Sequence, residues 1–305
     1  MQWSGNIMWR KKKIGIALSG GAARALCHIG VLEFLEELGV KADIVAGTSM
    51  GSVIGAIYCS GTPLKEIEEY VDSMDWRSFL LFSDLAISNT GMINGKRVEK
   101  VLKSFLGEKN FSDCSKRFCC VAVDIFSRKR VILSEGKLID AVRASISIPG
   151  FFAPVHLDNM LLVDGGIIEP LPTKAIKEFG ADMVIASSIS FEKNRERYKT
   201  ICKNDRSIRH DESKDGRPGI HMGLFNKLKG DNPKAVNVQS ILDTSFNIMQ
   251  REMARKYEEI ANIVINSEVG DFGYFDLIKG SEIIKRGRAA AESKEQEIRR
   301  KLRLR

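Results

Sequence analysis

The residues best suited to chemistry lie in three short glycine-containing segments. The first, Gly47-Thr48-Ser49-Met50-Gly51, is a G-x-S-x-G pattern. It follows a short apolar run and precedes a helical pattern, the context in which a serine on a sharp strand-to-helix turn presents its hydroxyl as a nucleophile. The alternative is a plain turn in which Ser49 caps the following helix. We favour the nucleophile because strand, turn and helix follow in the required order.

The second segment, Ser19-Gly20-Gly21-Ala22-Ala23-Arg24, also lies between a predicted strand and a predicted helix. Small residues at a helix start leave backbone N–H groups open to a negative group, and the helix dipole favours that charge. A phosphate or the oxyanion of acyl transfer would fit. A dinucleotide is disfavoured, because its G-x-G-x-x-G pattern needs glycine where Ala22 and Ala25 stand. Ala22 would be strained if the loop requires a positive φ.

The third segment, Asp164-Gly165-Gly166, ends another predicted strand. Alone it reads as an ordinary turn, but its carboxylate is a candidate base for Ser49. A serine is usually activated by histidine, and the chain has four. His28 is expected to pack inside a helix, while His156 shares a predicted hairpin with Asp164 and stays open as an alternative.

The other two histidines, His210 and His221, fall in a stretch without hydrophobic periodicity, a poor place to hold a base to within about 0.5 Å. A direct Ser49–Asp164 pair is therefore plausible.

The elements that position these segments alternate between buried strands and amphipathic helices, which predicts an α/β fold with a mostly parallel central sheet flanked by helices. The predicted strands are residues 14–18, 44–46, 118–123, 130–133, 160–163, 183–187 and 263–265. Helices are predicted after residue 21, over 52–59, 138–146, 173–179 and 236–260, and from Ser281 to the end.

We expect one domain. Residues 14–190 form its catalytic core, including a helical cap over about 63–107, and residues 235–305 add helices and a strand to complete it. Residues 191–234 are basic and lack periodicity, which predicts a flexible surface insertion. Within the cap, the apolar cluster from Trp76 to Phe82 is either ordinary helix core, or the lining of an acyl-chain pocket or an interfacial patch.

Composition excludes several classes of protein. Of the 305 residues, 44% are hydrophobic, a fraction typical of globular chains and too high for a disordered one. The net charge is +8. No apolar run approaches the ~20 residues that span a bilayer, and no signal peptide is visible. We therefore expect a cytoplasmic protein with reduced cysteines. Basic runs at residues 10–13 and 299–305 suit either solvated termini or peripheral contact with an anionic membrane; no nucleic-acid-binding motif accompanies them.

Taken together, the motifs resemble those of the patatin-like phospholipases, in particular their bacterial and archaeal branch. The resemblance covers about residues 14–190, with weaker likeness in the helix at 236–260 and at 270–272. It is carried by residues 18–24, 28–32, 47–51, 147–152, 162–166 and 170–172.

This resemblance implies a serine acyl hydrolase that cleaves carboxylic esters of lipids without metal or cofactor. Ser49 matches the nucleophile and Asp164 the base. Gly20, Gly21 and Ala22 match the oxyanion loop. The residues that match supporting positions of the motifs are Arg24, Gly47, Gly51, Gly165 and Gly166.

Two other functions stay open. An α/β-hydrolase would use a Ser–Asp–His triad. A non-catalytic lipid-binding or regulatory protein could keep the same fold, and Ala22 and Ala25, which replace glycines usual in the family's loop, keep this alternative alive. Acyl chain length, head group and oligomeric state do not follow from the sequence.

Overall fold

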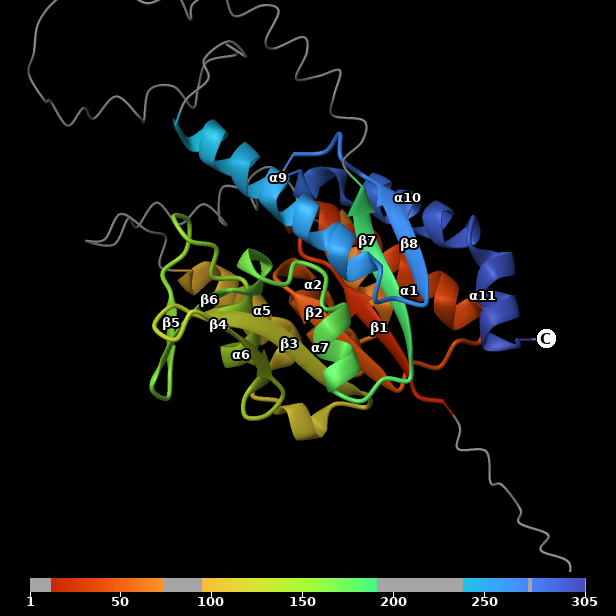
Figure 1. Cartoon of the computed structure of the whole chain (residues 1–305), viewed down its shortest axis with the longest axis horizontal. Coiled ribbons are helices and arrows are strands. Elements are labelled where there is room, and N and C mark those ends of the chain that lie inside the picture. Colours follow the sequence, from red (N-terminus) through yellow and green to blue (C-terminus); the bar gives the residue numbers. More distant parts are fainter. Residues whose placement is uncertain (1–11, 74–94, 191–237, 274–275, 305) are drawn as a thin grey trace, which may run out of the picture.

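The computed structural model describes residues 12–73, 95–190, 238–273 and 276–304 (Figure 1). Two predictions therefore fall wholly outside the described residues, the apolar cluster from Trp76 to Phe82 and the insertion at 191–234. A third does so in part, because residues 10 and 11 of the basic run at 10–13 are not described.

The centre of the molecule is an eight-stranded sheet, which confirms the predicted fold class. Five strands form its parallel part, in the spatial order β3, β2, β1, β7, β8. Their bounds are β1 Ile14–Leu18, β2 Ile44–Thr48, β3 Arg117–Asp124, β7 Met183–Ser190 and β8 Ile263–Glu268. The antiparallel part consists of β4 (Lys129–Leu133) and β6 (Met160–Asp164), which both pair with β3, and β5 (Val155–Leu157), which pairs with β6.

One edge of β3 is shared by two strands that approach each other. Strand β2 runs parallel to β3 as far as the pair Thr48–Val121. Strand β6 runs the other way along β3, and its last residue, Asp164, pairs with Ala122. Strand β4 occupies the opposite edge, since it pairs with the β3 residues that face β2 and β6. The ends of β2 and β6 therefore meet at neighbouring positions of one strand.

Helices cover both faces of the sheet. On one face lie α1 (Cys27–Glu37), α2 (Met50–Cys59), α3 (Leu64–Asp72), α5 (Lys96–Leu106), α6 (Leu138–Ser145) and α10 (Gly280–Glu292). On the other face lie α7 (Thr173–Glu178) and α9 (Val238–Glu258), which cross in front of the sheet in Figure 1. The chain ends with α11 (Glu295–Leu302).

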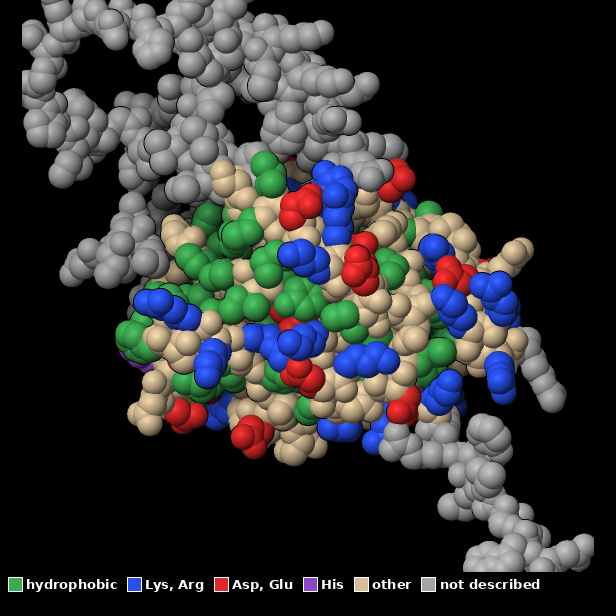
Figure 2. Space-filling view, in the orientation of Figure 1, with side chains coloured by type: hydrophobic (Ala, Val, Ile, Leu, Met, Phe, Trp, Pro, Cys, Tyr) green, Lys and Arg blue, Asp and Glu red, His purple; other side chains and the backbone are tan. Residues whose placement is uncertain are grey.

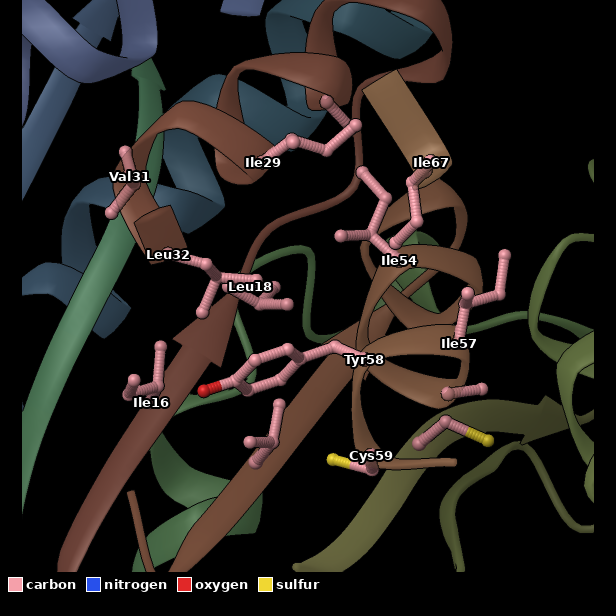
Figure 3. Packing of buried hydrophobic residues seen from close by; sticks show 14 of the residues in the cluster. Ile16, Leu18, Ile29, Val31, Leu32, Ile54, Ile57, Tyr58, Cys59 and Ile67 are labelled. Atoms are coloured by element: carbon pink, nitrogen blue, oxygen red, sulfur yellow. The ribbon is translucent and has the colours of Figure 1, made fainter. Parts of the chain in front are cut away.

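The larger core lies between the sheet and α1, α2 and α3. Figure 3 shows Ile16 and Leu18 of β1 packed against aliphatic side chains of α1 and α2. Helices α1 and α10 approach closely, because a Cβ on Gly30 would lie 2.2 Å from the Ile284 carbonyl oxygen and one on Gly287 would lie 1.9 Å from that of Cys27. This contact fixes the C-terminal helices against the first helix of the chain.

The structure departs from the sequence predictions in several strands and one helix. Strand β2 continues to Thr48 instead of stopping at residue 46, and β5 was not among the predicted strands. Strand β7 continues to Ser190 instead of stopping at Ser187. Strand β8 continues to Glu268 instead of Ile265. The predicted C-terminal helix is two helices, α10 and α11, separated at Ser293 and Lys294. Part of the predicted cap is seen as α3 and α5, and its role as a cap stays a prediction.

The basic C-terminal segment is folded. Arg299 pairs with Glu295, and Lys301 binds Glu297 and the carbonyl of Asn262, at the start of β8. Figure 2 shows Lys and Arg side chains spread among acidic ones over the visible face of the described residues, without one basic patch.

Candidate active site

Ser49 lies on a sharp turn between β2 and α2, with φ 54° and ψ −130°. Such a conformation costs a non-glycine residue about 1–3 kcal/mol and is typical of functional turns. Ser49 is the N-cap residue of α2, but its side chain makes no capping hydrogen bond to the helix, unlike in the alternative that treats it as an ordinary capping serine. Gly47 and Gly51 make the turn sterically feasible: a Cβ on Gly47 would lie 2.4 Å from the Gly51 carbonyl oxygen, and one on Gly51 would lie 2.4 Å from that of Leu18.

The loop after β1 lies directly beside Ser49. A Cβ on Gly20 would lie 3.1 Å from the Ser49 Cβ, closer than most such contacts, so the absence of a side chain there favours the close approach of the loop to Ser49. The Gly20 N–H donates to the Pro170 carbonyl at 2.9 Å. This corrects the expectation that Gly20 supplies an N–H to an oxyanion, because that N–H is already bonded to the loop that follows Asp164.

The next two residues, Gly21 and Ala22, have φ values of 153° and 51°. Their N–H groups find no acceptor among the described residues, so they are available to a ligand. The loop thus requires a positive φ at Ala22, the case in which strain is expected from the sequence. This conformation costs an alanine about 1–2 kcal/mol.

The loop is held from the other side by Arg24, which lies in the 3-10 helix η1 (Ala22–Leu26) and is 4% exposed. Its Nε donates to the Phe272 carbonyl at 2.9 Å, and its Nη1 donates to the Asn247 side-chain oxygen of α9 at 3.2 Å. Arg24 therefore ties the loop to the C-terminal part of the chain.

Asp164 is fully buried at the end of β6. Its Oδ1 accepts a hydrogen bond from the Gly166 N–H at 2.7 Å, while its Oδ2 is buried without a well-formed hydrogen bond to any described residue. Burial raises the pKa of the carboxyl from 3.8 to about 7, although the nearby Ser49 hydroxyl and the Gly166 N–H lower it. The hydroxyl and the carboxyl are thus close without a closed hydrogen bond, as is common for catalytic pairs before substrate binds.

The two glycines after Asp164 allow neighbouring groups to approach closely. A Cβ on Gly165 would lie 2.3 Å from the Val121 carbonyl oxygen of β3, and one on Gly166 would lie 2.1 Å from Gln250 Nε2 of α9. Gln250 is 7% exposed. It lines a small pocket beside the loop that follows β1, and the other lining residues of this pocket are Ser19, Gly20, Pro170, Ser188, Ile189 and Ala254.

A residue to which the sequence assigned no role also reaches Ser49. Ser145, the last residue of α6, is fully buried. Its hydroxyl accepts from the Ser49 N–H at 3.0 Å and donates to the Val121 carbonyl at 2.7 Å. The signal available in the sequence was its place directly before the segment 147–152 that carries the family resemblance.

The histidines that the structure describes do not contact Ser49. His28 is fully buried, and its ring bonds the Ser19 carbonyl at 2.9 Å and the Ser187 hydroxyl at 2.7 Å. Burial lowers its pKa to about 4, so it is neutral near pH 7. His156 is exposed on strand β5, and His210 and His221 lie outside the described residues.

The part of the chain that the structure describes holds neither a candidate metal site nor a candidate membrane-spanning helix. No three or more His, Cys, Asp and Glu side chains in this part of the chain are grouped so that they could hold a metal ion. No helix within it combines the length and apolar character needed to cross a bilayer.

Comparison with curated proteins finds similar sequences in bacteria and animals. An uncharacterized NTE family protein of Mycobacterium bovis is 35% identical over 178 residues, which are 58% of this chain and 49% of the relative. The neuropathy target esterase sws of Drosophila melanogaster is 31% identical over 183 residues, which are 58% of this chain and 13% of the relative. The chain thus spans about half the length, or less, of the curated relatives that it matches.

Among solved structures, VipD from Legionella pneumophila aligns with 94% of this chain and 67% of its own, at 15% identity and a TM-score of 0.49. A family model described as patatin-like phospholipase matches residues 16–176. This match spans more than half of the chain. It contains Ser49, Asp164 and the loop that follows β1. The chain belongs to the patatin-like phospholipase family.

Proposed function

We propose that this protein is a serine acyl hydrolase in which Ser49 is the nucleophile and Asp164 the base, and that it hydrolyses carboxylic esters of lipids. Family membership supports lipid hydrolysis in general. The observation that carries the finer proposal is the meeting of the ends of β2 and β6 on one edge of β3, which brings a strained, uncapped serine next to a buried carboxyl.

In the proposed first step, Asp164 takes the proton of the Ser49 hydroxyl while Oγ attacks the acyl carbon. The N–H groups of Gly21 and Ala22 stabilise the oxyanion that forms, an interaction worth about 3–4 kcal/mol for a single donor in known cases. Asp164 then gives its proton to the departing alcohol, which leaves an acyl-enzyme. Water attacks this ester with Asp164 again as base, and Ser49 regains its proton as the acid departs.

Two observations support this assignment over its rivals. A Ser–Asp–His triad would need a histidine beside Asp164, and His28 bonds Ser19 and Ser187 instead. A non-catalytic protein on the same fold would have no need of Ser49 in a strained conformation with its hydroxyl free of the helix.

The test is a hydrolysis panel of p-nitrophenyl esters and lysophospholipids, run with Ser49→Ala as control. A fluorophosphonate probe is used beside it to label the nucleophile. We expect hydrolysis by the wild type, labelling at Ser49, and loss of both in Ser49→Ala. A folded wild type that neither hydrolyses any ester nor reacts with the probe would favour the non-catalytic alternative. Loss of hydrolysis on replacing His156, His210 or His221 would favour the triad.

The panel also addresses the acyl-chain pocket predicted from the sequence. If Phe79 and Phe82 line such a pocket, replacing both with serine reduces activity on long-chain esters more than on short ones. An equal loss on both classes would indicate plain destabilisation.

Peripheral contact with an anionic membrane stays a prediction. Lys13 precedes β1, and Lys301 contacts the start of β8. These basic residues therefore lie at the amino ends of the parallel strands, whereas Ser49 lies at the carboxyl end of β2. Contact through them would not bring Ser49 to the lipid surface. The measurement is sedimentation with vesicles of rising anionic lipid content at low and high salt, with and without residues 1–13.

A further inference from the structure

The edge of β3 that β2 and β6 share has a gap where the two strands end. The last pair on one side is Thr48–Val121, and the first on the other is Asp164–Ala122. In a continuous parallel ladder the N–H after Thr48 would pair with the Val121 carbonyl. At this position the Ser49 N–H and the Val121 carbonyl are buried, so each needs a hydrogen-bond partner, and in this structure both bond a side chain.

The Ser145 hydroxyl supplies that partner for both groups. It accepts from the Ser49 N–H at 3.0 Å and donates to the Val121 carbonyl at 2.7 Å, and its side chain is fully buried. One oxygen atom thus takes the place of a ladder hydrogen bond at the position where the strand must turn away. Because all three groups are buried, loss of the hydroxyl leaves two backbone groups unpaired.

The same end of α6 also holds the other half of the pair. The carbonyl of Ser147 accepts from the Asp164 N–H at 2.9 Å. The side chain of Ser147 is directed elsewhere: its hydroxyl donates to the Arg143 carbonyl and accepts from the Arg143 Nη1, both at 2.8 Å. The Asp164 N–H therefore bonds a backbone carbonyl that an alanine at position 147 would keep, and the Ser147 hydroxyl takes no part in this bond.

We infer that Ser145 is a positioning residue for the proposed nucleophile: its hydroxyl holds the Ser49 backbone in the strained turn and so sets the position of the Ser49 hydroxyl relative to the Asp164 carboxyl. The inference rests on the proposed function. It gives Ser145 a role that requires no contact between Ser145 and the substrate. A displacement of about 1 Å at a reacting group can cost on the order of 100-fold in rate.

The experiment compares Ser145→Ala with Ser147→Ala, which removes an equivalent hydroxyl from the same helix end without touching Ser49. Circular dichroism first establishes that each variant is folded. Steady-state hydrolysis and the rate of fluorophosphonate labelling at Ser49 are then measured for the folded variants. We expect Ser145→Ala to lower kcat and the labelling rate by roughly 10- to 100-fold, with KM changed by less than threefold. Ser147→Ala should stay within threefold of the wild type.

A second pair of variants keeps the test valid if Ser145→Ala folds poorly. Thr and Val have the same shape and differ only in the hydroxyl, so a labelling rate at least fivefold higher in Ser145→Thr than in Ser145→Val supports the inference. Folded Ser145→Ala with wild-type kcat and labelling overturns it, as does an equal loss in Ser147→Ala or equal rates in the Thr and Val variants.

Amide hydrogen exchange separates this inference from the proposed function. The Ser49 amide should exchange faster in Ser145→Ala than in the wild type, whether or not the protein hydrolyses esters. An unlabelled, inactive wild type whose Ser49 amide becomes exposed in Ser145→Ala would refute the proposed function and keep the structural part of the inference. An active wild type with unchanged exchange in the variant would refute the inference alone.

Discussion

The buried carboxyl of Asp164 should leave a measurable mark on the stability of the protein. Asp164→Asn keeps the size of the side chain and an oxygen that can accept from the Gly166 N–H, but it cannot ionise. The folded wild type must instead hold a carboxylate in a fully buried position whenever the pH exceeds its pKa. We therefore expect Asp164→Asn to be inactive and yet more stable than the wild type above pH 7.

The size of this effect follows from the pKa. Burial raises the pKa of Asp164 from 3.8 to about 7, and each pKa unit corresponds to about 1.4 kcal/mol. Between these two values the folded state keeps a proton that the unfolded state has released, so wild-type stability falls as the pH rises through this window and levels off above it. The full cost is about 4 kcal/mol above pH 7, of which about 2.5 kcal/mol develops between pH 5 and pH 8.

The assay is urea unfolding of both proteins at several values between pH 5 and pH 8. The difference between the two proteins matters more than the wild-type curve, because His28 acts in the opposite direction. Its pKa is lowered from 6.5 to about 4 by burial, so its contribution to stability is lost as the pH falls through that range. His28 is present in both proteins and cancels in the difference. A difference that changes by less than about 0.5 kcal/mol across this range would refute the reasoning.

Catalysis should report the same group. The base form of Asp164 is the ionised one, so kcat/KM for a short-chain ester should rise with pH and reach a plateau above about 7. A profile already flat from pH 5 would show that the carboxyl ionises like an exposed one.

Three further substitutions probe the packing around the site. Gly20→Ala places a Cβ 3.1 Å from that of Ser49, so kcat should fall about 10-fold while the free energy of unfolding changes by less than about 1 kcal/mol in urea titrations; unchanged kcat would show that the loop can move aside. Gly51→Ala places a Cβ 2.4 Å from the Leu18 carbonyl oxygen. Thermal unfolding should therefore show a free energy of unfolding lower by at least about 2 kcal/mol. A smaller decrease would contradict the close approach. His28→Ala removes two buried hydrogen bonds. The free energy of unfolding, measured with urea at pH 7, should therefore fall by about 3 kcal/mol. A variant with wild-type stability but no activity would instead indicate a direct role of His28 in the chemistry.

Much of the fold could be predicted because the strands are short apolar runs, and glycines lie in the turns after β1, β2 and β6. Ile16 and Leu18 of β1 are buried on one face and Ala17 on the other, the pattern of a strand covered on both sides. The boundaries of β7 and β8 were missed because Ser188 and Ser267 are polar yet buried. In Ser188 the hydroxyl bonds Glu258 of α9, a partner that no local pattern reveals.

The candidate site was only partly visible in the sequence. Ser49 and Asp164 both lie in turns with recognisable glycine patterns, so both could be predicted as site residues from residue type and spacing. The use of the Gly20 N–H by Pro170 and the bridge through Ser145 depend on segments far apart in the chain. Their geometry is set by the register of β2 and β6 on β3, which a single sequence does not specify.

That register also explains how a carboxyl could do the work of a histidine in this protein. Because β6 runs antiparallel to β3, its last residue faces the end of β2, and a short side chain there is enough to approach Ser49. The same position is fully buried, and burial raises the pKa of Asp164 to about 7, the range in which a general base is most effective at neutral pH. An exposed aspartate would be ionised but a weak base. The burial that lowers the stability of the folded chain is thus what would make Asp164 basic enough to accept the proton of Ser49.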